Sequence, residues 1–177
     1  APLVNDSVMI PGSGINKEAD LVIDHLIHGK KLRPCDIHPD VDKALREGGV
    51  VLRNYQHEGV SWLRFLQRIN LNGALCDSMG LGKTLQAIVA VSLAHTDSAD
   101  DKEQAKSLVV CPSSIVGHWV NEIQRYFPRD SIFRVLALMG NSQQRHVLLK
   151  DKLEPSNLIV TSYEMLRNEI DSLSKVN

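Results

Sequence analysis

The sequence predicts an α/β fold in which a parallel sheet carries helices on its faces. After residue 50, short apolar runs alternate four times with stretches of helical periodicity. Parallel strands need a crossover between them, usually a helix, so this alternation favours a parallel sheet. Such sheets bind ligands beyond the carboxyl ends of their strands. The functional residues are therefore expected in the segments that follow the strands.

The composition is that of an ordinary globular protein. Of 177 residues, 43% are hydrophobic and 23% are charged, and the formal net charge is −1. This excludes a wholly disordered chain, and the near-neutral charge predicts no broad attraction to nucleic acid or membranes. No apolar run reaches the roughly 18 residues needed to cross a bilayer, and the first residues lack the pattern of a signal peptide. Three cysteines are too few for a disulfide framework, which suggests a reducing interior.

Residues 1–49 are expected to form a lead-in to the sheet. Residues 1–16 contain two prolines and two glycines and show no period, whereas Lys17 to His28 has helical spacing and is closed by Gly29. Residues 33–49 resemble a linker with one polar helical turn near 42–47. The boundary of the sheet-containing domain is therefore placed between residues 49 and 50.

The helices and strands expected in residues 50–177 follow from hydrophobic periodicity and from the positions of glycine and proline, which interrupt regular structure. Helices are expected over 55–69, 83–94, 115–127, 143–153 and 163–170. Strands are expected over 74–76, 108–111, 133–138 and 158–161. The polar, acidic stretch 95–105 is expected to be a mobile surface loop. The side chains of Trp62, Trp119, Cys76 and Cys111 are expected in the core.

The strongest functional signal is a glycine-rich segment between an expected strand and an expected helix. Its residues are Asp77, Ser78, Met79, Gly80, Leu81, Gly82, Lys83 and Thr84. The two glycines let the backbone turn its N–H groups inward, and the start of the helix adds further free N–H groups. Lys83 can supply a cation to the β and γ phosphates of ATP, and the Thr84 hydroxyl can hold Mg²⁺. The alternative is a chance glycine turn before a helix.

One position departs from the strict phosphate-loop pattern. Asp77 stands where that pattern has glycine, five residues before Gly82. This difference disfavours a GTPase-type or kinase-type loop and fits the variant found in helicases.

A second signal lies upstream, in the residues 52–63, LRNYQHEGVSWL. A glutamine amide offers both a donor and an acceptor, so Gln56 could pair with the edge of adenine. Without the phosphate-binding segment, this stretch would be interpreted simply as an amphipathic helix.

Together the two segments resemble the first conserved blocks of the Swi/Snf-type ATPases of helicase superfamily two, LRxYQxxGxxWL and DxMGLGKT. Residues 109–114, VVCPSS, followed by Trp119, and residues 158–163, LIVTSY, resemble the next blocks in the same order. The resemblance implies the RecA-like first lobe of a DNA-translocating motor. The family usually has an acid where this chain has Ser78, so we expect altered tuning of the site rather than its loss.

The resemblance also implies contacts with the backbone of double-stranded DNA. The residues concerned carry hydroxyls at expected helix starts, where hydroxyl and N–H groups suit phosphates. They are Ser113, Ser114, Thr161 and Ser162. The alternative is that these hydroxyls only cap helices.

Within this family, the chain most resembles the branch that removes TATA-binding protein from DNA. The resemblance rests on Cys76 before the phosphate-binding segment and on residues 26–32, 117–122, 161–163 and 167–171. It implies a nuclear, monomeric parent protein that meets TATA-binding protein through parts outside this chain, with no membrane contact.

In this family, an Asp-Glu pair on a later strand completes the magnesium site. No Asp-Glu dipeptide occurs in these 177 residues, so we expect the hydrolytic acids, and the arginines of a second lobe, to lie beyond Asn177. The fragment alone is therefore expected to be inactive in hydrolysis.

Two other functions remain open. One is a different helicase-type NTPase, including a chromatin remodeller or an enzyme that acts on RNA. The other is a non-catalytic interaction module that retains a nucleotide site. A zinc site at His25, His28, Cys35 and His38 is a weaker possibility, because the ligand spacing is unusual and only one thiolate is present.

Overall fold

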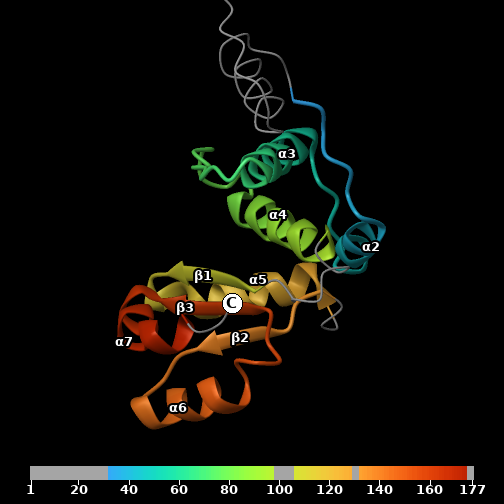
Figure 1. Ribbon diagram of the computed structural model, residues 1–177. Helices are drawn as coiled ribbons and strands as arrows, with labels where there is room; N and C mark the ends of the chain where they lie inside the picture. The colour runs from blue at the N-terminus through green and yellow to red at the C-terminus, as the bar shows by residue number, and fades with distance from the viewer. Residues whose placement is uncertain (1–31, 98–105, 129–131, 175–177) are drawn as a thin grey trace, which may run out of the picture. The chain divides into compact units, whose positions relative to one another are not determined.

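The computed structural model describes residues 32–97, 106–128 and 132–174 (Figure 1). The chain divides into two compact units, residues 1–33 and 34–177, and the elements described below all belong to the second. The helix expected over Lys17 to His28 lies outside the described residues. Of the four residues of the expected zinc site, His25 and His28 also lie outside, whereas Cys35 and His38 are described.

Within the described residues, three parallel strands form the sheet. They are β1 (Ser107–Cys111), β2 (Val135–Leu138) and β3 (Leu158–Ser162), in the order β1-β3-β2. Cys111 is opposite Ser162, and Leu138 is opposite Thr161, so the carboxyl ends of all three strands meet at one edge. The parallel sheet predicted from the sequence is confirmed, and these strands agree with three of the four expected ones.

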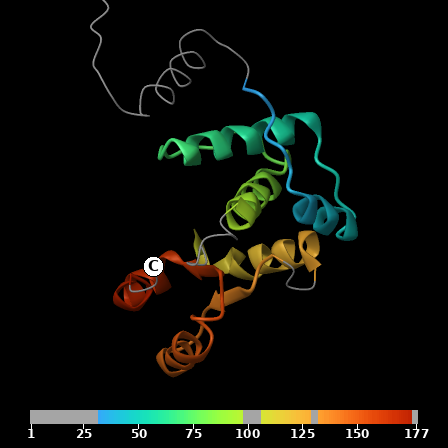
Figure 2. The same ribbon diagram turned by 45° about the vertical axis from the view of Figure 1, so that its right-hand side comes forward.

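Helices cover both faces of this sheet. Successive side chains of a strand point to opposite faces, and those of β3 join two different apolar clusters. Leu158 and Val160 pack in the cluster that contains Ile123 of α5 (Val116–Tyr126). Ile159 packs in the cluster that Leu148 of α6 (Ser142–Asp151) covers. Figure 2 shows α5 and α6 on either side of the strands.

This placement follows from the strand order. The crossover from β1 to β2 and the return from β2 to β3 run in opposite directions across the sheet. Because each parallel crossover is right-handed, their helices must lie on opposite faces. The last helix, α7 (Tyr163–Leu173), contributes Leu173 to the cluster on the α6 side.

Two longer helices precede the sheet. They are α3 (Asn54–Arg68) and α4 (Lys83–Asp97), and their buried side chains join the larger cluster through Val60 and Val89. Both helices were expected, although α4 extends three residues beyond the predicted end. Asp97 is helical and forms an ion pair with the buried guanidinium of Arg64, so residues 95–97 are not part of a surface loop.

The structure corrects the prediction of a linker over residues 33–49. The helix α2 (Pro39–Glu47) begins with proline at its first position, and the His38 ring accepts a hydrogen bond from the Asp40 N–H at 3.3 Å. Val41 and Leu45 are buried in the larger cluster. The second compact unit, residues 34–177, therefore includes α2, and the domain boundary expected between residues 49 and 50 stays a prediction.

The strand predicted over residues 74–76 is not formed. Residues 71–78 are irregular, and Cys76 is exposed instead of lying in the core, whereas Cys111 is buried as expected. A strand exists only through hydrogen bonds to a neighbouring strand. The three strands of the described sheet pair with one another and not with this segment. Among the described residues, no helix is long and apolar enough to cross a membrane.

Candidate functional site

The glycine-rich loop joins the irregular segment before residue 79 to the first turn of α4. Gly80 has φ +86° and Gly82 has φ +76°, both in the left-handed region that favours glycine. A Cβ on Gly82 would lie 2.6 Å from the Gln56 side-chain nitrogen, whereas the space around Gly80 is open. Gly80 is therefore needed for its backbone angle, and Gly82 is needed for both its angle and its small size.

Gln56 connects the loop to α3. Its side-chain oxygen accepts a hydrogen bond from the Arg53 N–H at 3.0 Å, and its side-chain nitrogen donates to the Leu81 carbonyl at 3.2 Å. The side chain is 7% exposed. An amide has two N–H donors and two acceptor lone pairs, so one of each remains. The structure brings Gln56 to the loop, and pairing with adenine stays a prediction.

Lys83 is the first residue of α4 and reaches back across the loop. Its ammonium nitrogen donates to the carbonyl oxygens of Asp77 at 2.7 Å and Ser78 at 3.0 Å. Thr84, the next residue, is half-buried in the first turn. A cation, a hydroxyl and the N–H groups of a helix start therefore lie within one short segment, and their role in nucleotide binding stays a prediction.

The sequence-based interpretation missed Gln86, which is fully buried beside this loop. Its side-chain nitrogen donates to the Asp77 carboxylate at 3.0 Å and lies 3.5 Å from the Leu81 carbonyl. Asp77 is thus held by its carboxylate and by its backbone carbonyl. The available signal was a polar side chain within the apolar run Leu85 to Ala90 of α4.

The residues expected to contact DNA lie at the carboxyl edge of the sheet. Ser113 and Ser114 are exposed in the 3₁₀ turn η1 (Ser113–Ile115) that follows β1. Thr161 is fully buried, and its hydroxyl donates to the Leu138 carbonyl at 3.0 Å. Ser162 is 4% exposed and accepts from the Met165 N–H, so it caps α7. The hydroxyls of Thr161 and Ser162 therefore have structural partners, and DNA contact remains a prediction for all four.

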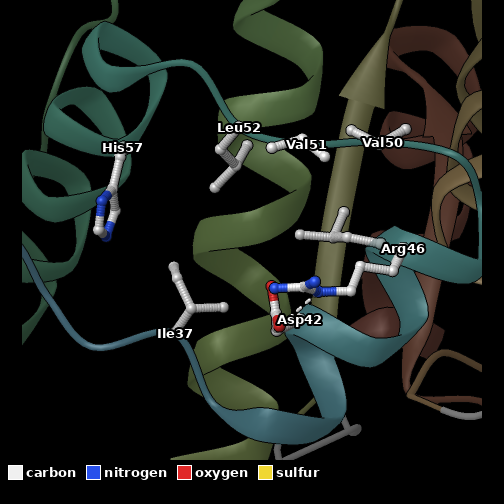
Figure 3. Close-up of a pocket in the computed structure, with 8 residues that line it drawn as sticks. Ile37, Asp42, Arg46, Val50, Val51, Leu52 and His57 are labelled. Carbon is white, nitrogen blue, oxygen red and sulfur yellow. Dashed lines mark hydrogen bonds and ion pairs between the residues drawn. The ribbon is translucent and has the colours of Figure 1, made fainter.

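A cavity of about 190 Å³ lies between α2, residues 50–52 and the first turn of α3. Figure 3 shows His57, Leu52 and Ile37 around this space, with the ion pair of Asp42 and Arg46 on the opposite side. The side chains that line the cavity are mainly aliphatic, and His57, the residue that follows Gln56 in the sequence, is among them. Among the described residues, no group of three His, Cys, Asp or Glu side chains is placed to hold a metal.

A parallel sheet and a glycine-rich loop at the start of a helix are typical of phosphate-loop NTPase domains. A family profile described as the SNF2-related domain matches residues 55–177, and the chain belongs to this family. The prediction of a RecA-like fold is confirmed by a similar solved structure, the Sulfolobus solfataricus SWI2/SNF2 ATPase core in complex with double-stranded DNA. It matches this chain with a TM-score of 0.54 and 32% sequence identity. That match covers 77% of this chain and 24% of the other.

Curated relatives place the chain near one branch of the family. It is 45% identical over 141 residues to the TATA-binding protein-associated factor BTAF1 of Arabidopsis thaliana, which covers 78% of this chain. It is 39% identical over 132 residues to the TATA-binding protein-associated factor MOT1 of Saccharomyces cerevisiae, which covers 70% of this chain. The aligned region is 7% of the length of each relative.

Proposed function

We propose that this chain binds ATP as part of the first lobe of a DNA-dependent ATPase. The observation that carries the proposal is the loop from Asp77 to Thr84. Two glycines in left-handed conformations precede a helix start, and Lys83 lies across the loop. Backbone N–H groups and a neighbouring cation are the groups that bind the phosphates of nucleotides.

The residues present suit a magnesium-bound nucleotide. The Thr84 hydroxyl would hold the ion, which when bound neutralises charge on the β and γ phosphates. Lys83 has three N–H donors, of which two contact loop carbonyls. The third donor, and the first two when they leave those carbonyls, would bind phosphate oxygens. Gln56 would recognise adenine with its remaining donor and acceptor.

Hydrolysis in the parent protein would need groups that this chain does not supply. The Asp-Glu pair and the second-lobe arginines expected beyond Asn177 would complete the charge around the γ-phosphate. One such arginine contributes about 10³ to 10⁵ in rate. We therefore propose nucleotide binding without turnover for residues 1–177.

The parent protein is proposed to move along double-stranded DNA in the nucleus and remove TATA-binding protein from it. This is supported by relatives that are named for association with TATA-binding protein and by the solved relative in complex with double-stranded DNA. Ser113 and Ser114 are exposed at the sheet edge and would contact phosphates without reading sequence.

The test is calorimetric titration of the chain with Mg-ATP and Mg-ADP. Lys83→Ala should weaken ATP binding by roughly 10- to 100-fold, because a hydrogen bond to a charged group contributes about 1.5–3 kcal/mol. Lys150→Ala, an exposed lysine on α6, is the matched control. Equal ATP affinity of Lys83→Ala and the wild type would refute the proposed role of the loop.

A further inference from the structure

The amide of Gln86 contacts both ends of the phosphate-binding loop. Its nitrogen reaches the Asp77 carboxylate at the start of the loop and the Leu81 carbonyl near its end. Because both partners are acceptors only, the amide nitrogen must face them, and its orientation is fixed by chemistry. The side chain is fully buried, so water does not compete for these contacts.

The other end of the same amide is unsatisfied. The Gln86 side-chain oxygen is buried and has no hydrogen-bond partner among the described residues. It lies against Gly59 of α3, where a Cβ would overlap with it. An unpaired buried oxygen costs about 1–3 kcal/mol. An aliphatic side chain would avoid this cost in a helix whose neighbouring residues Leu85, Ile88 and Val89 are buried, so stability alone does not account for a glutamine here.

The contacts of Gln86 converge with those of Gln56. Both side-chain nitrogens face the Leu81 carbonyl, at 3.2 Å from Gln56 on α3 and at 3.5 Å from Gln86 on α4. The Asp77 carbonyl is meanwhile held by Lys83 at 2.7 Å. The four residues between Asp77 and Gly82 are therefore tied down at both ends, whereas Met79 between them is 94% exposed.

We propose that Gln86 is a positioning residue that holds the phosphate-binding loop in its nucleotide-binding shape, with Gly59 providing the space for its amide. This inference rests on the proposed nucleotide binding. Gln86 acts through Asp77 and Leu81 and does not itself touch the nucleotide. This hydrogen bond also gives a reason for Asp77, which stands where the strict phosphate-loop pattern has glycine. Its carboxylate is the acceptor for the Gln86 amide.

The main test replaces Gln86 with methionine, which has a similar shape but lacks the amide. Two measurements are made on the whole chain: Mg-ADP affinity by calorimetry, and ¹⁵N relaxation of the Gly80, Leu81 and Gly82 amides without nucleotide. Gln86→Met should weaken ADP binding about tenfold and lower the order parameters of the loop amides. Ser92→Ala is the matched control, because Ser92 is equally buried on α4 but donates within its own helix, to the Val89 carbonyl.

A second pair of variants keeps the test decisive if Gln86→Met folds poorly. Asp77→Asn retains a side-chain oxygen that can accept from Gln86, whereas Asp77→Ala does not. Asp77→Asn should leave the order parameters of the loop amides at the values of the wild type, and Asp77→Ala should lower them. Combined with Gln86→Met, Asp77→Ala should add little further loss, since both remove the same contact.

The outcomes separate the two proposals. If the wild type does not bind ADP, the proposed function fails, but the relaxation data still decide whether Gln86 orders the loop. If the wild type binds ADP, and Gln86→Met leaves both affinity and loop order parameters at the values of the wild type, the positioning role is refuted. The positioning role would also be refuted if Gln86→Met lowered the melting temperature as much as Ser92→Ala does but changed neither ADP affinity nor the loop order parameters. That is the result expected of a purely structural role.

Discussion

The ammonium nitrogen of Lys83 lies 2.7 Å from the carbonyl oxygen of Asp77, six residues earlier in the chain. A second contact joins it to the Ser78 carbonyl at 3.0 Å. The positive charge is thus placed over the loop by neutral acceptors instead of by a carboxylate. Since an ion pair would neutralise this charge, carbonyl partners leave it available to an anion.

The first prediction is that Lys83→Arg will not restore the affinity of the wild type. A guanidinium keeps the charge, but its planar fork and greater size differ from a compact ammonium with three rotatable donors. We expect ATP affinity between those of the wild type and Lys83→Ala. The measurement is calorimetry at one ionic strength. Affinity equal to the wild type would mean that charge alone, and not the geometry of the loop carbonyls, determines binding.

The second prediction concerns Gly82→Ala. Alanine in a left-handed conformation costs about 1–2 kcal/mol, and its Cβ would also push the Gln56 amide away from Leu81. We expect a lower free energy of unfolding and weaker ADP binding. The control is Gly117→Ala in α5, where nothing lies within 4 Å of the added Cβ; this change should stabilise the protein by about 0.5–1 kcal/mol. Chemical denaturation measures the free energy of unfolding of the two variants. Equal changes for Gly82→Ala and Gly117→Ala would contradict the structural argument.

The sequence predicts the helices better than the contacts between distant residues. The helix α3 and the start of α4 follow from local periodicity, and the glycines of the loop follow from their spacing. The strand over 74–76 was wrong because strand formation depends on a partner that no local pattern reveals. The helix α2 was underestimated because its apolar face, Val41 to Leu45, is short. Gln86 was missed because its partner Asp77 lies nine residues away.

The third prediction concerns the ion pair that joins α6 to α7. The Arg145 Nε lies 2.7 Å from the Glu169 carboxylate, and the same guanidinium donates to the Gly140 carbonyl after β2 at 2.8 Å. The two side chains are only 11% and 17% exposed. Glu169 also interrupts α7, with φ −117° and ψ 16°. This pair therefore braces the loop after β2 against α7, next to the edge that carries the residues expected to bind DNA.

Removing one partner should cost more than removing both. Glu169→Leu leaves the Arg145 charge unpaired in a largely buried position. It should lower the free energy of unfolding by about 2–3 kcal/mol, because removing one partner of a fully buried ion pair costs roughly 3–5 kcal/mol and this pair is partly exposed. Arg145→Met with Glu169→Leu should recover part of this loss. Urea denaturation of the single and double variants measures the coupling. Strict additivity would show that the pair contributes nothing beyond its separate side chains.

The last prediction is that acid will destabilise the fold through His95. This histidine lies in the last turn of α4 and packs edge-on against Phe133 with ring centroids 5.5 Å apart. Its Nε2 lies 3.0 Å from the Ser107 hydroxyl. Burial, and then the positive charge of Arg134, lower its pKa from the ordinary value of 6.5. As pH falls below about 6.5 the unfolded chain therefore takes up this proton before the folded chain does. The associated stability is complete above pH 6.5 and is lost as pH falls through the lower pKa of the folded state.

The measurement is urea unfolding of the wild type and His95→Gln at pH 8, 7, 6 and 5. The variant lacks the titrating ring, so the stability difference between the two proteins should shrink as pH falls. His146→Gln, which replaces an exposed histidine on α6, serves as the control for the substitution itself. A stability difference between wild type and His95→Gln that stays constant from pH 8 to pH 5 would contradict the assignment. The fold must lose stability when the unfolded chain takes up a proton that the half-buried, neutral ring does not.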